Sequence, residues 1–207
     1  MEYKARDFSH LIGMKGFSKQ LLENHFTLYQ GYVENTNKLL NIFTEADKNP
    51  KDPKFADLKR HFGWEWNGMR LHEYYFDSLG GNGQLKQSPL MNAINKQFGN
   101  YQNWEQAFKA IGGMRGIGWA ALYFDHFADA LCNVWINEHD GGHLAGCTLI
   151  LILDVFEHAF MTDYGVKKDG YIEAFMQNVN WNLAAERFQN AQQYKPVDAQ
   201  QLIGSRK

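Results

Sequence analysis

The hydrophobic pattern of this 207-residue chain changes character along its length. Residues 17–45 and 55–80 carry apolar positions spaced at three and four, as long amphipathic helices do. Pro50 and Pro53 lie between these two stretches and would interrupt a continuous helix. The N-terminal part of the chain is therefore predicted to be a helical hairpin.

A different series of elements follows Pro89. Two short helices are predicted, and then three strand-like runs, at residues 89–98, 101–111, 119–124, 131–136 and 148–153. Helical patterns return from residue 154, at 171–179 and at 183–189, and the tail from Pro196 is expected to be loosely ordered. Helices, then three strands, then helices predict an α+β fold with a three-stranded antiparallel sheet.

The stretch from Gly80 to Pro89 separates these two parts, because its glycines and proline end the helical pattern. We expect two domains. The N-terminal helical-hairpin domain would span residues 1–85, and the C-terminal α+β domain with the sheet would span residues 86–207.

The composition excludes several functional classes. Hydrophobic residues make up 44% of the chain, enough for a packed core, and the net charge of −2 gives no indication of nucleic-acid or membrane-surface binding. No apolar run reaches the ~18 residues of a membrane span, and the polar N-terminus does not resemble a secretory signal. Cys132 and Cys147 imply no disulfide framework. We expect a soluble cytoplasmic protein.

Asp154 and His158 follow directly on the buried strand expected at residues 148–153. We expect Asp154 to begin a helix, in which a residue four positions later lies one turn away and can point into the same volume. A carboxylate and an imidazole at this spacing suit iron, manganese or zinc. The pair alone fits a helix cap with a surface histidine equally well, so a metal site needs further ligands.

Two other histidines lie on apolar helix faces. His25 shares a face with Leu21 and Tyr32, and His72 begins a similar stripe. A lone buried histidine is more often a hydrogen-bonded core residue than a ligand. Two of them on separate helices, with a carboxylate and a third histidine elsewhere, favour a metal site. Four further histidines have no apolar setting and are interpreted as surface or loop residues: His10, His61, His126 and His143.

Several segments resemble the iron/manganese superoxide dismutase family, in order and at family spacings, over about residues 16–188. They are Phe17–His25, similar to the first helix; Leu71–Phe76, similar to Asn-His-x-Phe-x-Trp; Asp154–Ala159, similar to Asp-Val-Trp-Glu-His-Ala; and Gly116–Trp119 and Val179–Trp181, similar to Gly-Ser-Gly-Trp and Val-Asn-Trp.

The resemblance implies a superoxide dismutase that converts superoxide to oxygen and hydrogen peroxide with one iron or manganese ion per chain. It places His25, His72, Asp154 and His158 as the metal ligands. An ungapped alignment would put Asn24 at the first ligand position, which we reject because an amide is a poor ligand here.

The resemblance also implies roles for residues around the metal. Tyr32 resembles the gateway tyrosine that faces substrate. Family members use a Gln or a His to tune the metal potential through the bound solvent. Gly68 offers no side chain for this role, so His139 is expected to take it. His139 in place of Gln, together with bulky Ile152, favours iron over manganese. Lys168, where the family usually carries Arg, is expected to attract the superoxide anion.

The chain also departs from the family pattern. One residue fewer between His25 and Tyr32 removes the gateway histidine that normally pairs with the tyrosine, and would restore α geometry to a helix that often carries a π-bulge. Phe76 and Phe156 replace tryptophans, and Met161 replaces a tyrosine. These changes leave open a metal-binding protein of this fold with weak or lost activity and a structural role.

Two other iron proteins are disfavoured. An oxygenase with two His and one carboxylate needs a roomy pocket for an organic substrate, whereas aromatic residues crowd every expected ligand. A di-iron carboxylate bundle is excluded, because the chain contains no Glu-x-x-His pair.

Finally, the resemblance implies a homodimer in which Glu157 accepts a hydrogen bond from the partner subunit's His158. A metal-bound imidazole needs an acceptor for its second nitrogen. Neighbouring residues on a helix point about 100° apart, so Glu157 cannot easily serve its own chain, whereas a twofold axis lets each subunit supply the other.

Overall fold

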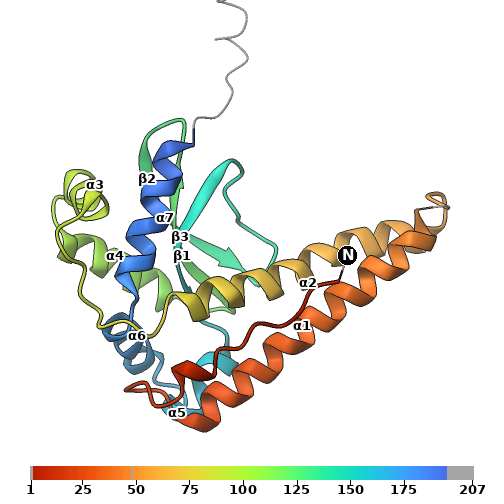
Figure 1. Cartoon of the computed structure of the whole chain (residues 1–207), viewed down its shortest axis with the longest axis horizontal. Coiled ribbons are helices and arrows are strands. Elements are labelled where there is room, and N and C mark those ends of the chain that lie inside the picture. The colour runs from red at the N-terminus through yellow and green to blue at the C-terminus, as the bar shows by residue number, and fades with distance from the viewer. Residues whose placement is uncertain (1, 48, 195–207) are drawn as a thin grey trace, which may run out of the picture.

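The N-terminal half forms a long helical hairpin in the computed structural model, which describes residues 2–47 and 49–194. Helix α1 (Lys19–Ala46) begins where the Ser18 side chain accepts a hydrogen bond from the backbone of Leu21. Helix α2 (Pro53–Asp77) begins with proline at its first position and Asp52 as its cap. The two helices run antiparallel as one extended arm (Figure 1). The predicted hairpin is confirmed.

Helix α1 is α-helical from end to end, as the shortened spacing between His25 and Tyr32 predicts. The two residues are seven positions apart, which corresponds to two α-helical turns, so their side chains lie on one face. The deletion therefore leaves both residues directed at the same region without a bulge.

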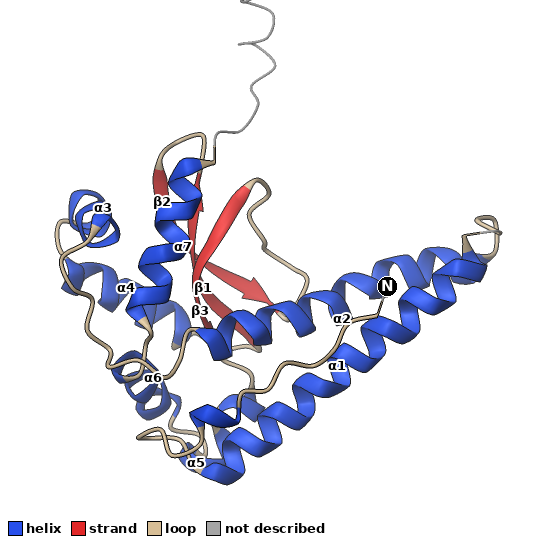
Figure 2. Cartoon of the chain, in the orientation of Figure 1, coloured by secondary structure: helices blue, strands red, loops and turns tan. Residues whose placement is uncertain are grey.

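The C-terminal half is built on a three-stranded antiparallel sheet, shown in red in Figure 2. Strand β1 (Gly118–Asp125) lies between β2 (Ala130–Asn137) and β3 (Cys147–Asp154), and its first seven residues are buried. Helices group beside the sheet in Figure 1: α3 (Pro89–Phe98), α4 (Tyr101–Gly112) and α7 (Trp181–Gln193). The predicted α+β class and the antiparallel sheet are confirmed.

The remaining elements are short. They are the 3-10 turns η1 (Ser9–Leu11) and η2 (Glu157–Ala159) and the helices α5 (Met161–Tyr164) and α6 (Lys168–Gln177). Two of them, η2 and α5, pack against α1. No helix of the described residues is long and apolar enough to cross a membrane. The predicted disorder of the tail from Pro196 lies outside the described residues.

Our expectation that Asp154 begins a helix is wrong. Asp154 is the last residue of β3 and pairs with Trp119 of β1, while His158 lies in the 3-10 turn η2. The Asp154 side chain accepts a hydrogen bond at 2.9 Å from the backbone N–H of Phe156, which turns the chain immediately after the strand. This turn, rather than an α-helix, brings His158 back towards Asp154.

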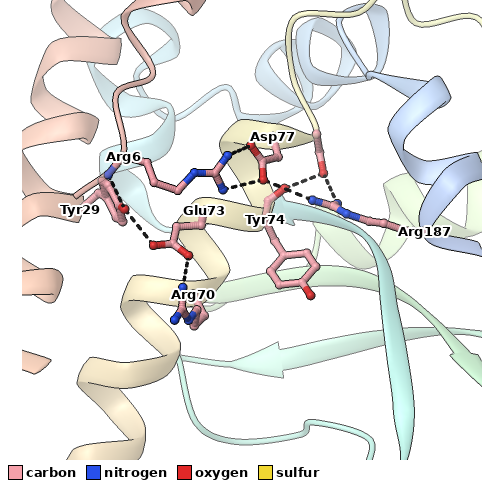
Figure 3. Close-up of polar contacts among 8 residues, drawn as sticks. Arg6, Tyr29, Arg70, Glu73, Tyr74, Asp77 and Arg187 are labelled. Carbon is pink, nitrogen blue, oxygen red and sulfur yellow. Dashed lines mark hydrogen bonds and ion pairs between the residues drawn. The ribbon is translucent and has the colours of Figure 1, made fainter. Parts of the chain in front are cut away.

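A polar network fastens the N-terminal segment to the hairpin and to α7 (Figure 3). Arg6 makes a bidentate pair with Asp77 at 2.7 and 2.8 Å, and Asp77 also lies 3.7 Å from Arg187. Glu73 accepts hydrogen bonds from Tyr29 and Arg70. Because Glu73 is the neighbour of His72, this network fixes the part of α2 that carries the second expected ligand.

Candidate metal centre

The four expected metal ligands meet at one point between the hairpin and the end of the sheet. They come from α1, α2, the last residue of β3 and η2, and one ligand atom from each lies within 4.8 Å of all the others: His25, His72, Asp154 and His158. Asp154 Oδ2 lies 3.2 Å from Nε2 of His25, 3.2 Å from Nε2 of His158 and 3.6 Å from Nε2 of His72. Three imidazoles thus surround one carboxylate oxygen.

The ring nitrogens that face this point have little else to bind. The Nδ1–H of His72 donates to the carbonyl of Gly68 at 2.5 Å, which leaves its Nε2 lone pair directed at the centre. The Nε2 atoms of His25 and His72 are buried and make no hydrogen bond to any described residue. Such buried atoms cost free energy unless something binds them. The donor set fits a cation of the iron or manganese class, which takes imidazole nitrogen and carboxylate oxygen.

The electrostatics of the site also favour a cation. Burial lowers the pKa of His25 and lowers the pKa of His72 well below its usual range. Burial alone would raise the pKa of Asp154, but His158 and His25 beside it hold that pKa well below its usual range. The buried imidazoles are therefore neutral and the carboxylate is ionised, which is the protonation state that metal binding requires.

Tyr32 and His139 lie together beside the four ligands. His139 is fully buried, and its Nε2 lies 2.7 Å from the Tyr32 hydroxyl. Its Nδ1 accepts a hydrogen bond at 3.2 Å from the indole N–H of Trp119. Burial lowers the pKa of His139 to about 4, so the ring is neutral. Because Nδ1 is an acceptor, the single ring proton is on Nε2 and is donated to the Tyr32 oxygen.

This tautomer determines what Tyr32 can do. Its ring stacks on that of His72 with centroids 5.2 Å apart, and burial raises its pKa, so the phenol is protonated. Since its oxygen already accepts from His139, its own O–H is free to donate elsewhere. Tyr32 therefore presents a proton donor beside the metal ligands.

Gly68 makes room for this tyrosine. A Cβ atom at Gly68 would lie 2.5 Å from Cδ1 and 2.7 Å from Cε1 of Tyr32, far inside van der Waals contact. From the sequence, Gly68 indicated only the absence of a side chain. The structure shows that the Tyr32 ring occupies the space that such a side chain would need, and that the Gly68 carbonyl orients His72.

Aromatic side chains enclose the site, including the two that replace family tryptophans. Phe76 contacts His25 with ring centroids 4.9 Å apart, and Phe156 stacks on His139 at 4.6 Å. Trp64 was not predicted as a site residue, although its ring lies 4.9 Å from that of His139.

The remaining histidines lie at the surface or in loops, as predicted, but two of them make specific contacts. His143 is half-buried; its Nε2–H donates to the His139 carbonyl at 2.9 Å, and its Nδ1 lies 3.0 Å from the Tyr123 hydroxyl. It therefore supports the loop that carries His139. His126 is also half-buried and lies 2.7 Å from the hydroxyl of Thr148. His10 and His61 are exposed.

Lys168, which we expected to attract superoxide, lies at the surface and contacts none of the metal ligands. Its ammonium donates to the carbonyl of Met114 at 2.5 Å, and with Arg115 and Lys167 it lines an open surface pocket of about 940 Å³. No metal ligand lines that pocket. Burial lowers the pKa of Lys168, although Glu157 nearby acts in the opposite direction. Attraction of superoxide by Lys168 stays a prediction.

Comparisons with known proteins agree with this arrangement. The family model of iron/manganese superoxide dismutases, C-terminal domain, matches residues 86–187. An iron superoxide dismutase from Cupriavidus metallidurans is 39% identical over 182 residues, which cover 84% of this chain and 90% of that protein. A manganese superoxide dismutase from Haloferax volcanii is 33% identical, with 84% of this chain and 88% of the relative covered. An iron superoxide dismutase from Saccharolobus solfataricus is 31% identical, with 83% and 85% covered. The chain belongs to the iron/manganese superoxide dismutase family.

Proposed function

We propose that this protein is a superoxide dismutase that binds one iron or manganese ion through His25, His72, Asp154 and His158. Two superoxide anions and two protons would give one oxygen molecule and one hydrogen peroxide molecule. The observation that carries the proposal is the convergence of four ligand atoms within 4.8 Å, two of them buried imidazole nitrogens that approach Asp154 but make no hydrogen bond to any described residue. The family relationship supplies the reaction, and the alternative of an inactive structural protein is not favoured.

The residues of the chain divide this work. The ion, when bound, supplies the one-electron oxidation and reduction of superoxide. Asp154 and the three imidazoles would hold it, while the aromatic side chains around them would exclude bulk water and larger substrates. His139 holds its Nε2 proton against the Tyr32 oxygen, and Tyr32 in turn donates its own O–H towards the substrate position. We propose that this pair controls the protonation of the solvent beside the ion and thereby its potential.

We propose a preference for iron. Support comes from His139, which we expect to take the tuning role in place of a glutamine, and from the bulky Ile152 in the strand that ends at Asp154. The relatives include proteins named for iron and for manganese, so both ions suit the family. Expression with each metal, followed by elemental analysis and activity per bound ion, would measure the preference.

We propose a homodimer formed through Glu157 and His158. The His158 side chain is 26% exposed, the most exposed of the four ligands, and its neighbour Glu157 is exposed as well. A carboxylate of the partner could therefore reach the outer edge of this imidazole. Met161 and Val166, which follow closely, are apolar side chains exposed by 47% and 89%. Light scattering should show a dimer for the wild type and a lighter, metal-poor species for Glu157→Ala.

We further propose a cytoplasmic location and a division into domains at residues 85 and 86. Cys132 and Cys147 are both free thiols, which suits a reducing compartment. The helical hairpin and the sheet fall on opposite sides of the proposed boundary.

The decisive experiment for the activity is the decay of superoxide, followed directly by stopped flow or pulse radiolysis, with iron-loaded, manganese-loaded and metal-free protein. We expect catalysis in proportion to bound metal. His72→Ala should lose both metal and activity, whereas His10→Ala, a change at an exposed histidine outside the site, should retain both. Stoichiometric metal with no acceleration of decay would favour the structural role instead.

A further inference from the structure

Two buried tyrosine hydroxyls lie beside the metal ligands and have no part in the reaction proposed above. Tyr75 on α2 and Tyr171 on α6 are both fully buried. Their hydroxyl oxygens lie 2.9 Å apart, and the Tyr171 hydroxyl donates at 2.7 Å to the backbone carbonyl of Asp154. These hydrogen bonds therefore run from the hairpin to the main chain of a metal ligand.

The direction of the two hydrogen bonds follows from the acceptor at their end. A carbonyl oxygen only accepts, so Tyr171 uses its single hydroxyl proton on Asp154. The proton between the two hydroxyls must then belong to Tyr75. Hydroxyls that donate in sequence polarise one another, so the bond from Tyr75 strengthens the bond from Tyr171 to Asp154.

Asp154 depends on such support because it is the last residue of β3, where the chain leaves the sheet. Its strand pairing with Trp119 fixes one side of its backbone. Its Oδ1 accepts a hydrogen bond at 2.9 Å from the N–H of Phe156, and its carbonyl accepts from Tyr171. With these oxygens bound, Oδ2 remains to face the three histidines at 3.2 to 3.6 Å.

Aromatic neighbours hold the rings that carry the two hydroxyls. Tyr75 stacks on Phe175 of α6, with ring centroids 5.9 Å apart and planes inclined by only 8°. Tyr171 contacts Phe160, with centroids 5.8 Å apart. The Tyr75 ring also lies 5.3 Å from the ring of the ligand His25. One tyrosine thus contacts a ligand of the hairpin, and the other bonds a ligand at the end of the sheet.

The tyrosine pair joins the two halves of the ligand set. His25 and His72 come from the hairpin, whereas Asp154 and His158 come from the end of the sheet and the turn after it. Ligand nitrogen and oxygen atoms bind a metal of this class at about 2.0–2.2 Å. A shift of one half against the other therefore alters several metal–ligand distances together. The bond between Tyr75 and Tyr171 resists such a shift directly beside the ligands.

We propose that Tyr75 and Tyr171 are positioning residues of the metal centre, whose hydrogen bonds fix Asp154 against the histidines of the hairpin and thereby set the affinity for the ion and the geometry of its ligands. This inference rests on the metal binding that belongs to the proposed dismutase function. Neither tyrosine supplies a ligand atom, and neither gains or loses a proton in this role. Removing a partner that orients a ligand typically weakens metal binding by roughly 10–100-fold.

The first readout is the affinity for Mn²⁺, measured by competition with a chelator. Tyr171→Phe and Tyr75→Phe each remove one hydroxyl and keep the ring. Tyr164→Phe is the matched control, because its hydroxyl also donates to a backbone carbonyl, that of Gly16, which carries no ligand.

We expect Tyr171→Phe to bind Mn²⁺ about tenfold more weakly than wild type, and Tyr75→Phe roughly threefold more weakly. The double variant should match Tyr171→Phe, because Tyr75 acts through Tyr171; fully additive losses would contradict this order. If Tyr171→Phe does not fold, Tyr75→Phe carries the same test, since the Asp154 carbonyl keeps its donor.

The second readout is the electron paramagnetic resonance spectrum of the iron-loaded protein, which depends on the arrangement of the ligands around the ferric ion. We expect Tyr171→Phe to change this spectrum and Tyr164→Phe to leave it as in wild type, even where both variants lose unfolding free energy. An affinity and a spectrum in Tyr171→Phe and Tyr75→Phe that match those of Tyr164→Phe would refute the positioning role. Stoichiometric metal without superoxide decay in wild type would instead refute the proposed function, because neither readout uses superoxide.

Discussion

Gly68→Ala tests whether the position of Tyr32 controls the site without any change to a ligand. The added methyl would lie 2.5 to 2.9 Å from three atoms of the Tyr32 ring. Carbon atoms prefer separations of about 3.5–4.0 Å, so the ring must move by about 1 Å. The hydrogen bond from His139 to the Tyr32 hydroxyl, now 2.7 Å long, would then exceed the usual limit for such a bond.

The balance of energies follows from these contacts. Replacing a helical glycine with alanine gains about 1 kcal/mol, whereas overpacking costs roughly 1–3 kcal/mol and the lost hydrogen bond about 1 kcal/mol. We expect a net destabilisation of about 1–3 kcal/mol, measured by urea unfolding. Metal should be retained, because only the orientation of Tyr32 changes, while the rate of superoxide decay should fall about tenfold.

Gly63→Ala is the matched control on the same helix. A Cβ atom there would meet only the side chain of Asp140, at 3.9 Å, so the variant should gain up to about 1 kcal/mol and keep full activity. If Gly68→Ala were as stable and as active as Gly63→Ala, the reasoning about Tyr32 would be refuted.

Three further changes probe the surroundings of the site. His139→Ala should keep most metal but shift the reduction potential and lose activity, and His139→Gln should retain more, because an amide can also donate; an unchanged potential and rate would contradict a tuning role. The metal-free protein should lose roughly 3 kcal/mol of stability between pH 6.5 and 4, because unfolded His139 binds a proton below pH 6.5 and the folded ring only near its pKa of about 4. The lowered pKa values of His25 and His72 make the stability fall with pH in the same direction. Urea unfolding of His139→Gln provides the control, because this variant should lack the part of the pH dependence that His139 contributes. Arg6→Ala should cost about 1 kcal/mol or less, since its pair with Asp77 is partly exposed, and should leave the rate per metal ion unchanged.

The sequence was most informative where residue type and spacing act together. Two helical patterns and three apolar runs predicted the hairpin and the sheet, because burial of one helix face or strand leaves a periodic pattern. Spacing and apolar setting favoured a metal site at His25, His72, Asp154 and His158, and the family resemblance then placed these four residues as the ligands. The helix expected at Asp154 was wrong because a hydrogen bond from Phe156 to that carboxylate favours a turn after the strand. The helix propensities of these residues do not indicate that this hydrogen bond forms.

Other features depend on contacts between distant segments and were invisible beforehand. Trp64 and His143 support His139 from α2 and from a loop, and neither lies in a recognisable motif. The role of Gly68 became apparent only when Tyr32 of the other helix was seen over it. Tyr75 and Tyr171 are 96 positions apart, and spacing along the chain does not predict the hydrogen bond between them.

The metal content of His25→Ala and Asn24→Ala, measured beside wild type after loading with iron, tests the centre most directly. The two residues are neighbours on α1, but His25 is buried with its Nε2 3.2 Å from Asp154, whereas Asn24 is exposed and hydrogen-bonds Gln20. We expect one ion per chain in wild type and in Asn24→Ala, and a loss of stoichiometric metal together with superoxide decay in His25→Ala. Full metal and activity in His25→Ala, with loss of both in Asn24→Ala, would contradict the site described here.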